Sequence, residues 1–488
     1  MNLTRRQLIR GSTAAVSVAA LAACDSHSPP VSATSRPAQV DLRDIAPSID
    51  LGGTASATTQ LQHVLDATPA GTTVRVPLGT TLNLSAGPVR IRRQLVIDGR
   101  GAHVVANGTT PAWQLGSDAS GASFIGLQLH GDKPTRYALN HRAFDIAGTP
   151  AHPVRGLRFT DVTVDGFGAA GWWAGHMSGA ILEDCTVTRC CYAGFMMMSA
   201  SRVELRNPTV SALQGILAGG YLQSYPIAFT RDATRPIELS PVSRDCTVRG
   251  GHISRTGWEG VDTHGGVGIK VIGTTIKGCL IGIAFVPSSD TNGHDRWAPQ
   301  HCVARSCEID SGVSDGSKGP GVRLVGAGGP GARIMAATGE VRDNIIRGHG
   351  GGLRPDGVGS DPNNVSGGIQ MYQTQGVQLE GNRIEEPSPF GISLWYDNAN
   401  VSVGNTMVVD PWSDQFATPS AVGLCSTGNS VRLGAVQLRT GERSAGYRDV
   451  GGVYARTAKG NSMKLTGGHG FTAAATPFAG ARLAAPHI

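Results

Sequence analysis

A repeat of 23 residues constrains the fold of this chain more than any other feature. A polar residue, then any residue, then Thr-Val begins at Asp161, Asp184 and Asn207, at intervals of 23 residues. Related units, some separated by insertions, begin at Gly250, Gly273, Ser306, Asp343, Gly381 and Gly404. Each unit consists of short runs with alternating apolar positions, separated by turns. A unit this short cannot bury its own apolar face, so neighbouring units must stack on one another.

Stacked units of this kind predict an all-β fold, a single-stranded parallel β-helix solenoid. The content of 68 glycines and only 16% charged residues agrees with closely stacked strands joined by tight turns. Upstream of the repeats, Thr54–Ala67 has the polar cap residues and the apolar spacing of a short amphipathic helix. We expect this helix to cap the N-terminal end of the solenoid, because an uncovered sheet edge pairs with other chains.

In this pattern the chain resembles the pectate-lyase-type right-handed parallel β-helix superfamily, over roughly residues 41–450. The resemblance implies a right-handed coil, and it specifies a fold far better than a reaction. The expected division is a cap with the first coils at 41–110, the β-helix at 111–450, and a C-terminal coil and cap at 451–488.

The amino terminus has the features of an export signal. Twin arginines in "TRRQLIR" precede a short apolar run and then "LAAC", which ends at Cys24. This order predicts a twin-arginine signal peptide with a lipobox at 1–24, and lipidation of Cys24. Residues 25–40 are then a flexible tether, and the protein is a membrane-anchored lipoprotein that faces the periplasm or the cell exterior. The alternative is a plain signal peptide with a chance cysteine.

Charge and cysteine content exclude several functions. The net charge is +6, and removal of the signal with its three arginines leaves +3, without a basic stripe, so a nucleic-acid partner is not expected. Eight further cysteines occupy repeat positions and are predicted to be small core residues, without zinc spacing. No cofactor is predicted; calcium, which is common in pectate lyases, stays open because no dense acidic cluster assigns it.

Alignment of the strands after the repeat glycine predicts which side chains face inward. Two columns are apolar, and they are expected to face the core: Val261, Ile283, Val322, Ile369 and Ile392, and Thr263, Phe285, Leu324, Met371 and Leu394. The alternate columns then point outward: Asp262, Ala284, Arg323, Gln370 and Ser393, and His264, Val286, Val325, Tyr372 and Trp395. In a second register, Cys307, Asn344, Asn382 and Asn405 are expected to point inward and to form an asparagine ladder.

The outward face is the predicted functional surface. Long insertions border it, and exposed aromatic rings suit the binding of sugar rings. Packing beneath a loop is the alternative for Tyr372 and Trp395. The predicted substrate-binding residues are Gln370, Tyr372, Trp395, Trp258 and Trp173.

The stretch "EGVDTH" resembles a short motif of the mannuronan C5-epimerases, with Gly260, Asp262 and His264 as the matching residues. The resemblance implies that His264 moves the C5 proton of a uronic acid while a basic residue neutralises the carboxylate. Glu259 and Thr263 stand where that family has Tyr and Pro, and the nearest outward cation is Arg323, two coils away.

The predicted catalytic residues are therefore Asp262, His264, Arg323 and Glu259. The predicted function is action on a polysaccharide by a lyase or a C5-epimerase. A glycoside hydrolase remains open, with Asp262 and a second carboxylate from Glu259, Asp290, Asp295 or Asp397. A non-catalytic glycan-binding lipoprotein is the third alternative.

Overall fold

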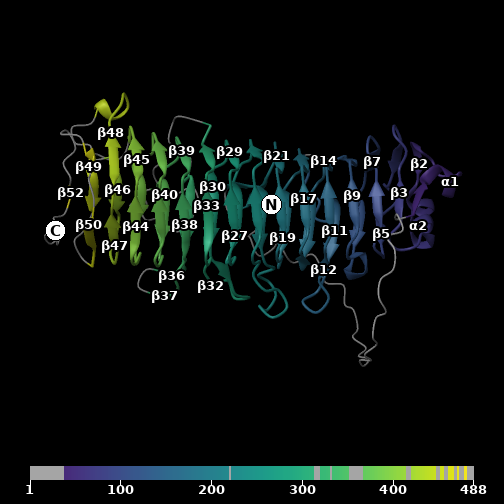
Figure 1. Ribbon diagram of the computed structural model, residues 1–488, viewed down its shortest axis with the longest axis horizontal. Helices are drawn as coiled ribbons and strands as arrows, with labels where there is room; N and C mark the ends of the chain where they lie inside the picture. The colour runs from purple at the N-terminus through teal and green to yellow at the C-terminus, as the bar shows by residue number, and fades with distance from the viewer. Residues whose placement is uncertain are drawn as a thin grey trace.

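The chain forms a right-handed parallel β-helix, in which three long sheets run side by side along one axis (Figure 1). The computed structural model describes residues 38–133, 135–218, 221–312, 319–329, 332–350, 366–413, 419–446, 451–455, 460–466, 470–471 and 478–480. Within these residues, two of the long sheets have 15 strands and the third has 14. The neighbouring strands around the candidate site pair in parallel. The predicted fold class is confirmed.

The 14-stranded sheet carries the candidate functional residues, and we call it the site sheet. In spatial order it contains β5 (Val89–Ile91), β8 (Trp113–Leu115), β11 (Arg142–Ala147), β15 (Ala170–Gly175), β19 (Ala193–Met198), β24 (Tyr225–Thr230), β27 (Glu259–His264), β30 (Ile281–Val286), β35 (Val322–Val325), β40 (Gly367–Tyr372), β43 (Phe390–Leu394), β46 (Ser420–Leu424), β49 (Gly451–Ala455) and β52 (Phe478–Gly480). Both predicted apolar columns are buried inside the coil. Spatial order follows chain order, so each coil adds one strand to each sheet.

The predicted N-terminal helix exists but is shorter than expected. Helix α2 (Thr58–Ala67) covers the N-terminal end, where it contacts β5 and buries Leu61, Val64 and Leu65. The preceding residues form β2 (Gly52–Ser56), which pairs with β4 (Thr81–Asn83). Thr54 therefore lies in a strand, because pairing to the next coil outweighs the weak helical preference of a β-branched residue.

The inward asparagine ladder is confirmed in part. Asn344 donates from Nδ2 to Oδ1 of Asn382 at 3.0 Å, and the backbone N–H of Cys307 donates to Oδ1 of Asn344 at 2.9 Å. The prediction is wrong for Asn405, which is exposed, while Thr406 occupies the inward position in that coil. Met407 pairs with Arg383, so the true register is shifted by one residue from the aligned motif.

All eight cysteines in the described part of the chain are free thiols, and all are buried. Burial raises the pKa of the Cys185, Cys190 and Cys302 thiols to about 12. They act as small core residues, as predicted, and not as nucleophiles, because the reactive form of a cysteine is the thiolate.

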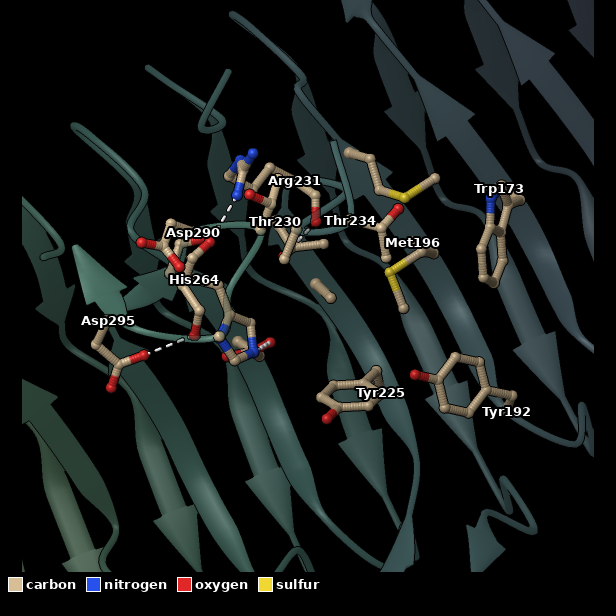
Figure 2. Close-up of a pocket in the computed structure, with 18 residues that line it drawn as sticks. Trp173, Tyr192, Met196, Tyr225, Thr230, Arg231, Thr234, His264, Asp290 and Asp295 are labelled. Carbon is tan, nitrogen blue, oxygen red and sulfur yellow. Dashed lines mark hydrogen bonds and ion pairs between the residues drawn. The ribbon is translucent and has the colours of Figure 1, made fainter. Parts of the chain in front are cut away.

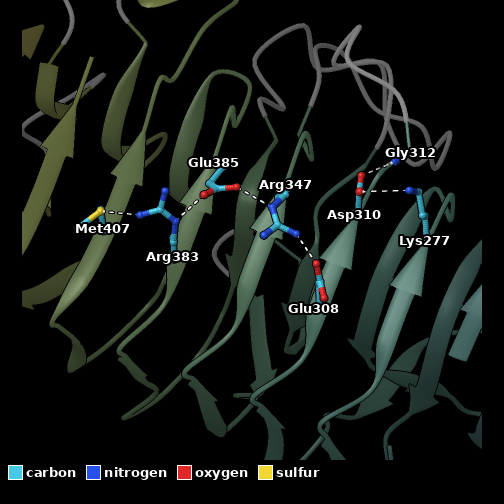
Figure 3. A network of polar contacts seen from close by, with 8 residues as sticks. All are labelled: Lys277, Glu308, Asp310, Gly312, Arg347, Arg383, Glu385 and Met407. Atoms are coloured by element: carbon cyan, nitrogen blue, oxygen red, sulfur yellow. Dashed lines mark hydrogen bonds and ion pairs between the residues drawn. The ribbon is translucent and has the colours of Figure 1, made fainter. Parts of the chain in front are cut away.

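Charged side chains on the outside of the solenoid connect successive coils. Arg347 lies between Glu308 and Glu385, and Glu385 also accepts a hydrogen bond from Arg383 (Figure 3). These residues belong to β34 (Glu308–Asp310), β39 (Ile345–Arg347) and β42 (Arg383–Glu385). Alternating charge thus lines up the stacked coils, although exposed pairs of this kind contribute little stability individually.

No helix in the described part of the chain is long and apolar enough to span a membrane. The predicted export signal, the predicted lipidation site Cys24 and most of the predicted tether lie outside the described residues.

Candidate functional site

Strand β27 places two polar side chains beside each other on the outer face of the site sheet. Val261 and Thr263 point into the core, so Asp262 and His264 point outward, as predicted. His264 Nε2 lies 2.9 Å from Asp262 Oδ2, and His264 Nδ1 lies 3.3 Å from the carbonyl oxygen of Pro287. The two side chains are nearly buried, with Asp262 1% exposed and His264 9%.

The donor and acceptor roles of these atoms limit the protonation states in which both contacts are hydrogen bonds. A carbonyl oxygen can only accept a hydrogen bond, and so can an ionised carboxylate, whereas a neutral imidazole has one N–H. Both contacts of His264 are satisfied when the ring is protonated on both nitrogens, or when the carboxyl of Asp262 is protonated and donates. In either of these states the pair would hold one transferable proton.

Glu259 joins this pair, although strict alternation along the strand would point it inward. One carboxylate oxygen from each of Glu259 and Asp262 and one nitrogen of His264 lie within 4.8 Å of one another. Between Glu259 and Val261, Gly260 packs closely on the next coil: a Cβ there would lie 2.6 Å from the carbonyl oxygen of Gly282 and 2.7 Å from Ile276.

The three groups could also hold a cation. Calcium prefers sites made entirely of oxygen ligands, whereas imidazole suits first-row transition metals. Two carboxylates and one imidazole are therefore a donor set closer to that of a transition metal than to the calcium left open by the sequence.

A pocket of about 520 Å³ opens above Asp262 and His264. Figure 2 shows rings and thioethers on one side of it and acidic side chains with His264 on the other. On the first side lie Trp173, Tyr192, Met196 and Tyr225, and on the second lie His264, Asp290 and Asp295; Met198 and Asp262 also line the pocket. An apolar wall opposite a polar one is typical of carbohydrate and other small-molecule sites.

A hairpin inserted after β30 supplies the acidic wall. Its strands are β31 (Ser288–Ser289) and β32 (Asp295–Trp297). Hydrogen bonds from the backbone N–H of His294, together with Arg296 and Asn292, lower the pKa of Asp290 to about 2. Asp290 is therefore ionised and organises the turn. Asp295 accepts a hydrogen bond from the hydroxyl of Ser289 at 2.7 Å.

Among the described residues that line the pocket, Arg231 is the one arginine or lysine. The sequence analysis did not predict it as a site residue. Its guanidinium donates to the carbonyl oxygens of Ser240 and Ser289, both at 2.7 Å, and to that of Arg235. It also stacks on Trp297, with 4.8 Å between Cζ and the ring centroid. These contacts connect two loops, so Arg231 supports the pocket wall. A lone arginine after a strand gave no signal for this role.

The predicted binding residues separate into two groups. Trp173 lines the pocket, and Trp258 belongs to the same apolar cluster as Trp173 without lining the pocket itself. Tyr372 and Trp395 form a different cluster, several coils downstream, where their rings stack at 5.6 Å. They are 6% and 5% exposed, so the expectation of an exposed aromatic row is wrong for them; they pack in a cluster with Phe390, and neither lines the pocket.

The remaining predicted residues lie with the downstream cluster. Arg323 stacks on Tyr372, with its Cζ 5.6 Å from the ring centroid, and it does not line the pocket. Gln370 pairs with Arg323 in register and is 4% exposed. Two of the four predicted catalytic residues, Asp262 and His264, therefore line the pocket, Glu259 adjoins them, and Arg323 is remote.

Comparison with known proteins gives fold similarity. No protein family matches the sequence, and no curated protein is similar to it in sequence. Among solved structures, the catalytic unit of a GH87 alpha-1,3-glucanase from Streptomyces thermodiastaticus is similar, with a TM-score of 0.53, 13% identity, and coverage of 92% of this chain and 71% of that chain. The A-module of an Azotobacter vinelandii mannuronan C-5 epimerase has a TM-score of 0.51, 16% identity, and coverage of 76% and 99%. At these identities the similarity shows the β-helix fold alone.

Proposed function

We propose that the protein cleaves a polysaccharide at the pocket above β27, and that the Asp262–His264 pair donates the proton to the departing glycosidic oxygen. The single observation that carries this proposal is the position of His264 between two acceptors, Asp262 and the carbonyl of Pro287. A group that holds a proton in the resting state is suited to be a general acid.

The charge of the pocket favours hydrolysis of a neutral glycan. Asp262, Asp290 and Asp295 line it, while the donors of Arg231 point to backbone carbonyls. A uronate would bring a further negative charge into this acidic surrounding, where like charges repel. Hydrolysis needs a second carboxylate to activate water or to attack the sugar. Asp295 fits that role better than Asp290, whose oxygens are engaged within the hairpin.

A uronate lyase or C5-epimerase is the second candidate, and the contact between His264 and Asp262 favours it. A carboxylate that orients an imidazole also prepares it to accept a proton during the reaction. In this reaction the negative charge of the uronate must be neutralised. The ligand atoms of Glu259, Asp262 and His264 offer a place for a cation that would do so.

Products distinguish the two candidates. Purified protein is incubated with α-1,3-glucan and, separately, with polymannuronate, and three signals are followed: new reducing ends, ultraviolet absorbance of unsaturated ends, and C5 inversion by NMR. Reducing ends without unsaturation support hydrolysis. Unsaturation or inversion supports the second candidate. Any product formed by the wild type should be absent with Asp262→Asn, which is the inactive control. No change in either polymer with the wild type contradicts catalysis on these two linkages.

We also propose that the protein is exported by the twin-arginine route and anchored to a membrane through Cys24. The sequence pattern supports this proposal. The test compares the wild type with Cys24→Ser in membrane and soluble fractions, together with the intact mass of the mature chain. An unmodified wild-type mass would contradict the anchor.

A further inference from the structure

A second cavity of about 260 Å³ lies on the same face of the site sheet, toward the N-terminal end. Arg90, Gln114 and Asp145 line it, and these residues are register partners on three successive strands, β5, β8 and β11. Their side chains are partly exposed or exposed, in contrast to the nearly buried Asp262.

The two cavities are lined by consecutive positions in one column of outward residues. The register continues from Asp145 to Trp173, then through Met196 and Ala228 to Asp262. The first three positions of this column line the second cavity, and the last four line the pocket above β27. Six steps between stacked strands span roughly 29 Å.

Side-chain contacts connect the two cavities. Arg90 donates from Nε to Gln114 at 3.1 Å, and Gln114 donates to Asp145 at 3.4 Å. Asp145 in turn accepts from Arg142 at 2.6 Å, and the guanidinium of Arg142 lies 4.2 Å from the ring centroid of Trp173. Four polar side chains are thus followed by an aromatic ring along the face, and these are the groups that bind the hydroxyls and the flat faces of sugars.

The pocket does not extend in the opposite direction. Beyond Asp262 the column continues through Ala284, Arg323, Gln370 and Ser393, and none of these residues lines the pocket. The hairpin that carries Asp295 lines the pocket at this end. A chain that enters over the N-terminal coils therefore ends at the hairpin.

We propose that the column from Arg90 to Asp262 is a one-ended binding groove for a polysaccharide chain, with a distal sugar subsite at Arg90, Gln114 and Asp145. This inference rests on the proposed function, and it adds that the protein prefers long chains and acts near a chain end. The polymer lies along the solenoid axis, and its terminal part occupies the pocket above β27.

The test measures affinity against chain length, independently of turnover. The full-length mature protein with His264→Ala, which prevents consumption of the ligand, is titrated by calorimetry with α-1,3-linked gluco-oligosaccharides and with oligomannuronates, from disaccharide to decasaccharide. We expect affinity to rise with length until the distal subsite is filled. Gln114→Ala and Arg90→Gln in this background should weaken binding of the long chains about tenfold, the value of one hydrogen bond to a charged or polar partner, and leave the shortest unaffected.

Arg158→Gln is the matched control, because Arg158 is an exposed arginine on another sheet, in β13 (Arg158–Thr160). Thermal unfolding of each variant confirms that the fold is retained. Equal affinity for short and long chains, an equal loss at every length, or no binding in either series overturns the groove. Length dependence in a protein that yields no product leaves the groove in place and contradicts the proposed catalysis, so the two failures can be told apart.

Discussion

The outer face of the site sheet has two regions that look alike in sequence and differ in structure. Upstream, from Arg90 to Asp262, outward residues line two cavities. Downstream, the outward residues Tyr372 and Trp395 are buried in a cluster with Phe390. Both regions carry aromatic and charged residues at outward positions, so residue type alone does not distinguish them.

The comparison teaches that the surroundings of an outward column decide its role. Trp173 and Trp395 are both outward tryptophans with similar small exposure, 9% and 5%. Trp173 has a cavity in front of it, whereas Trp395 has Tyr372 stacked on it. Alternation within a strand predicts which way a side chain points, and loops and neighbouring rings determine what it meets.

The largest difference between the two regions should appear in catalysis. Asp262→Asn removes the carboxylate that holds the proton on the pair, and kcat should fall about 10²–10⁴-fold. Arg323→Gln in the downstream region should leave kcat unchanged, because Arg323 stacks on Tyr372, away from the pocket. Steady-state rates on the polymer identified by product analysis check both variants. A comparable loss in Arg323→Gln would show that the two regions act together.

The next difference concerns the two tryptophans. Trp395→Ala should lower the free energy of unfolding by about 3–5 kcal/mol, because it empties a packed cluster. The KM of this variant should stay near that of the wild type. Trp173→Ala also loses packing, but in addition it should raise KM about tenfold through loss of a sugar-stacking surface. Urea unfolding and KM are measured on both. An increase in KM for Trp395→Ala alone would reverse the assignment of the two regions.

Substitutions at the inward Asn382 and the outward Asn405 should have smaller effects, which concern only the free energy of unfolding. Asn382→Ala leaves the backbone N–H of Asn344, one side-chain N–H of Asn344 and the carbonyl of Val341 without this partner, at a cost of about 1–3 kcal/mol. Asn405→Gly keeps the positive φ of this exposed residue and should cost within about 0.5 kcal/mol. Urea unfolding of both variants tests the one-residue shift in register. Equal costs would contradict it.

The smallest expected effect is at acid pH, in the hairpin that closes the pocket. The pKa of Asp290 is lowered to about 2, against about 3.9 in an unfolded chain. The stabilisation from its hydrogen bonds is therefore complete above about pH 4 and is lost as the pH falls through about 2. Carbon-13 NMR of the Asp290 carboxyl should show this low midpoint. A midpoint near 4 would mean that the hairpin does not hold the carboxylate.

Much of the fold follows from the sequence because the repeat acts at every coil. The inward columns around Val261 and Phe285 were predicted correctly, since an apolar stripe repeated on neighbouring strands leaves one way to stack. The error at Asn405 arose where a similar motif tolerates a shift of one residue. The alignment also missed a second inward ladder, in which Asn398 donates to Asn429 at 2.7 Å and Asn429 donates to Asn461 at 3.0 Å.

The site was predicted less completely, because most of its walls come from insertions. Asp262 and His264 were found from strand alternation, which is a local property. Glu259 lies near them although alternation along the strand would point it inward, so alternation alone did not place it. The role of Arg231 depends on two loops that meet through its guanidinium. Such contacts between distant segments leave no periodic trace in the sequence.

The column from Arg90 to Asp262 also limits how a polymer can move. A groove with the same side chain on every rung would let a repeating chain slide, because each displacement by one rung restores the same contacts. Here successive rungs present Arg, Gln, Asp, Trp, Met, Ala and Asp. A displacement by one strand brings each sugar unit against a different side chain. A bound chain therefore has one preferred alignment with the groove, and sliding along it is unfavourable.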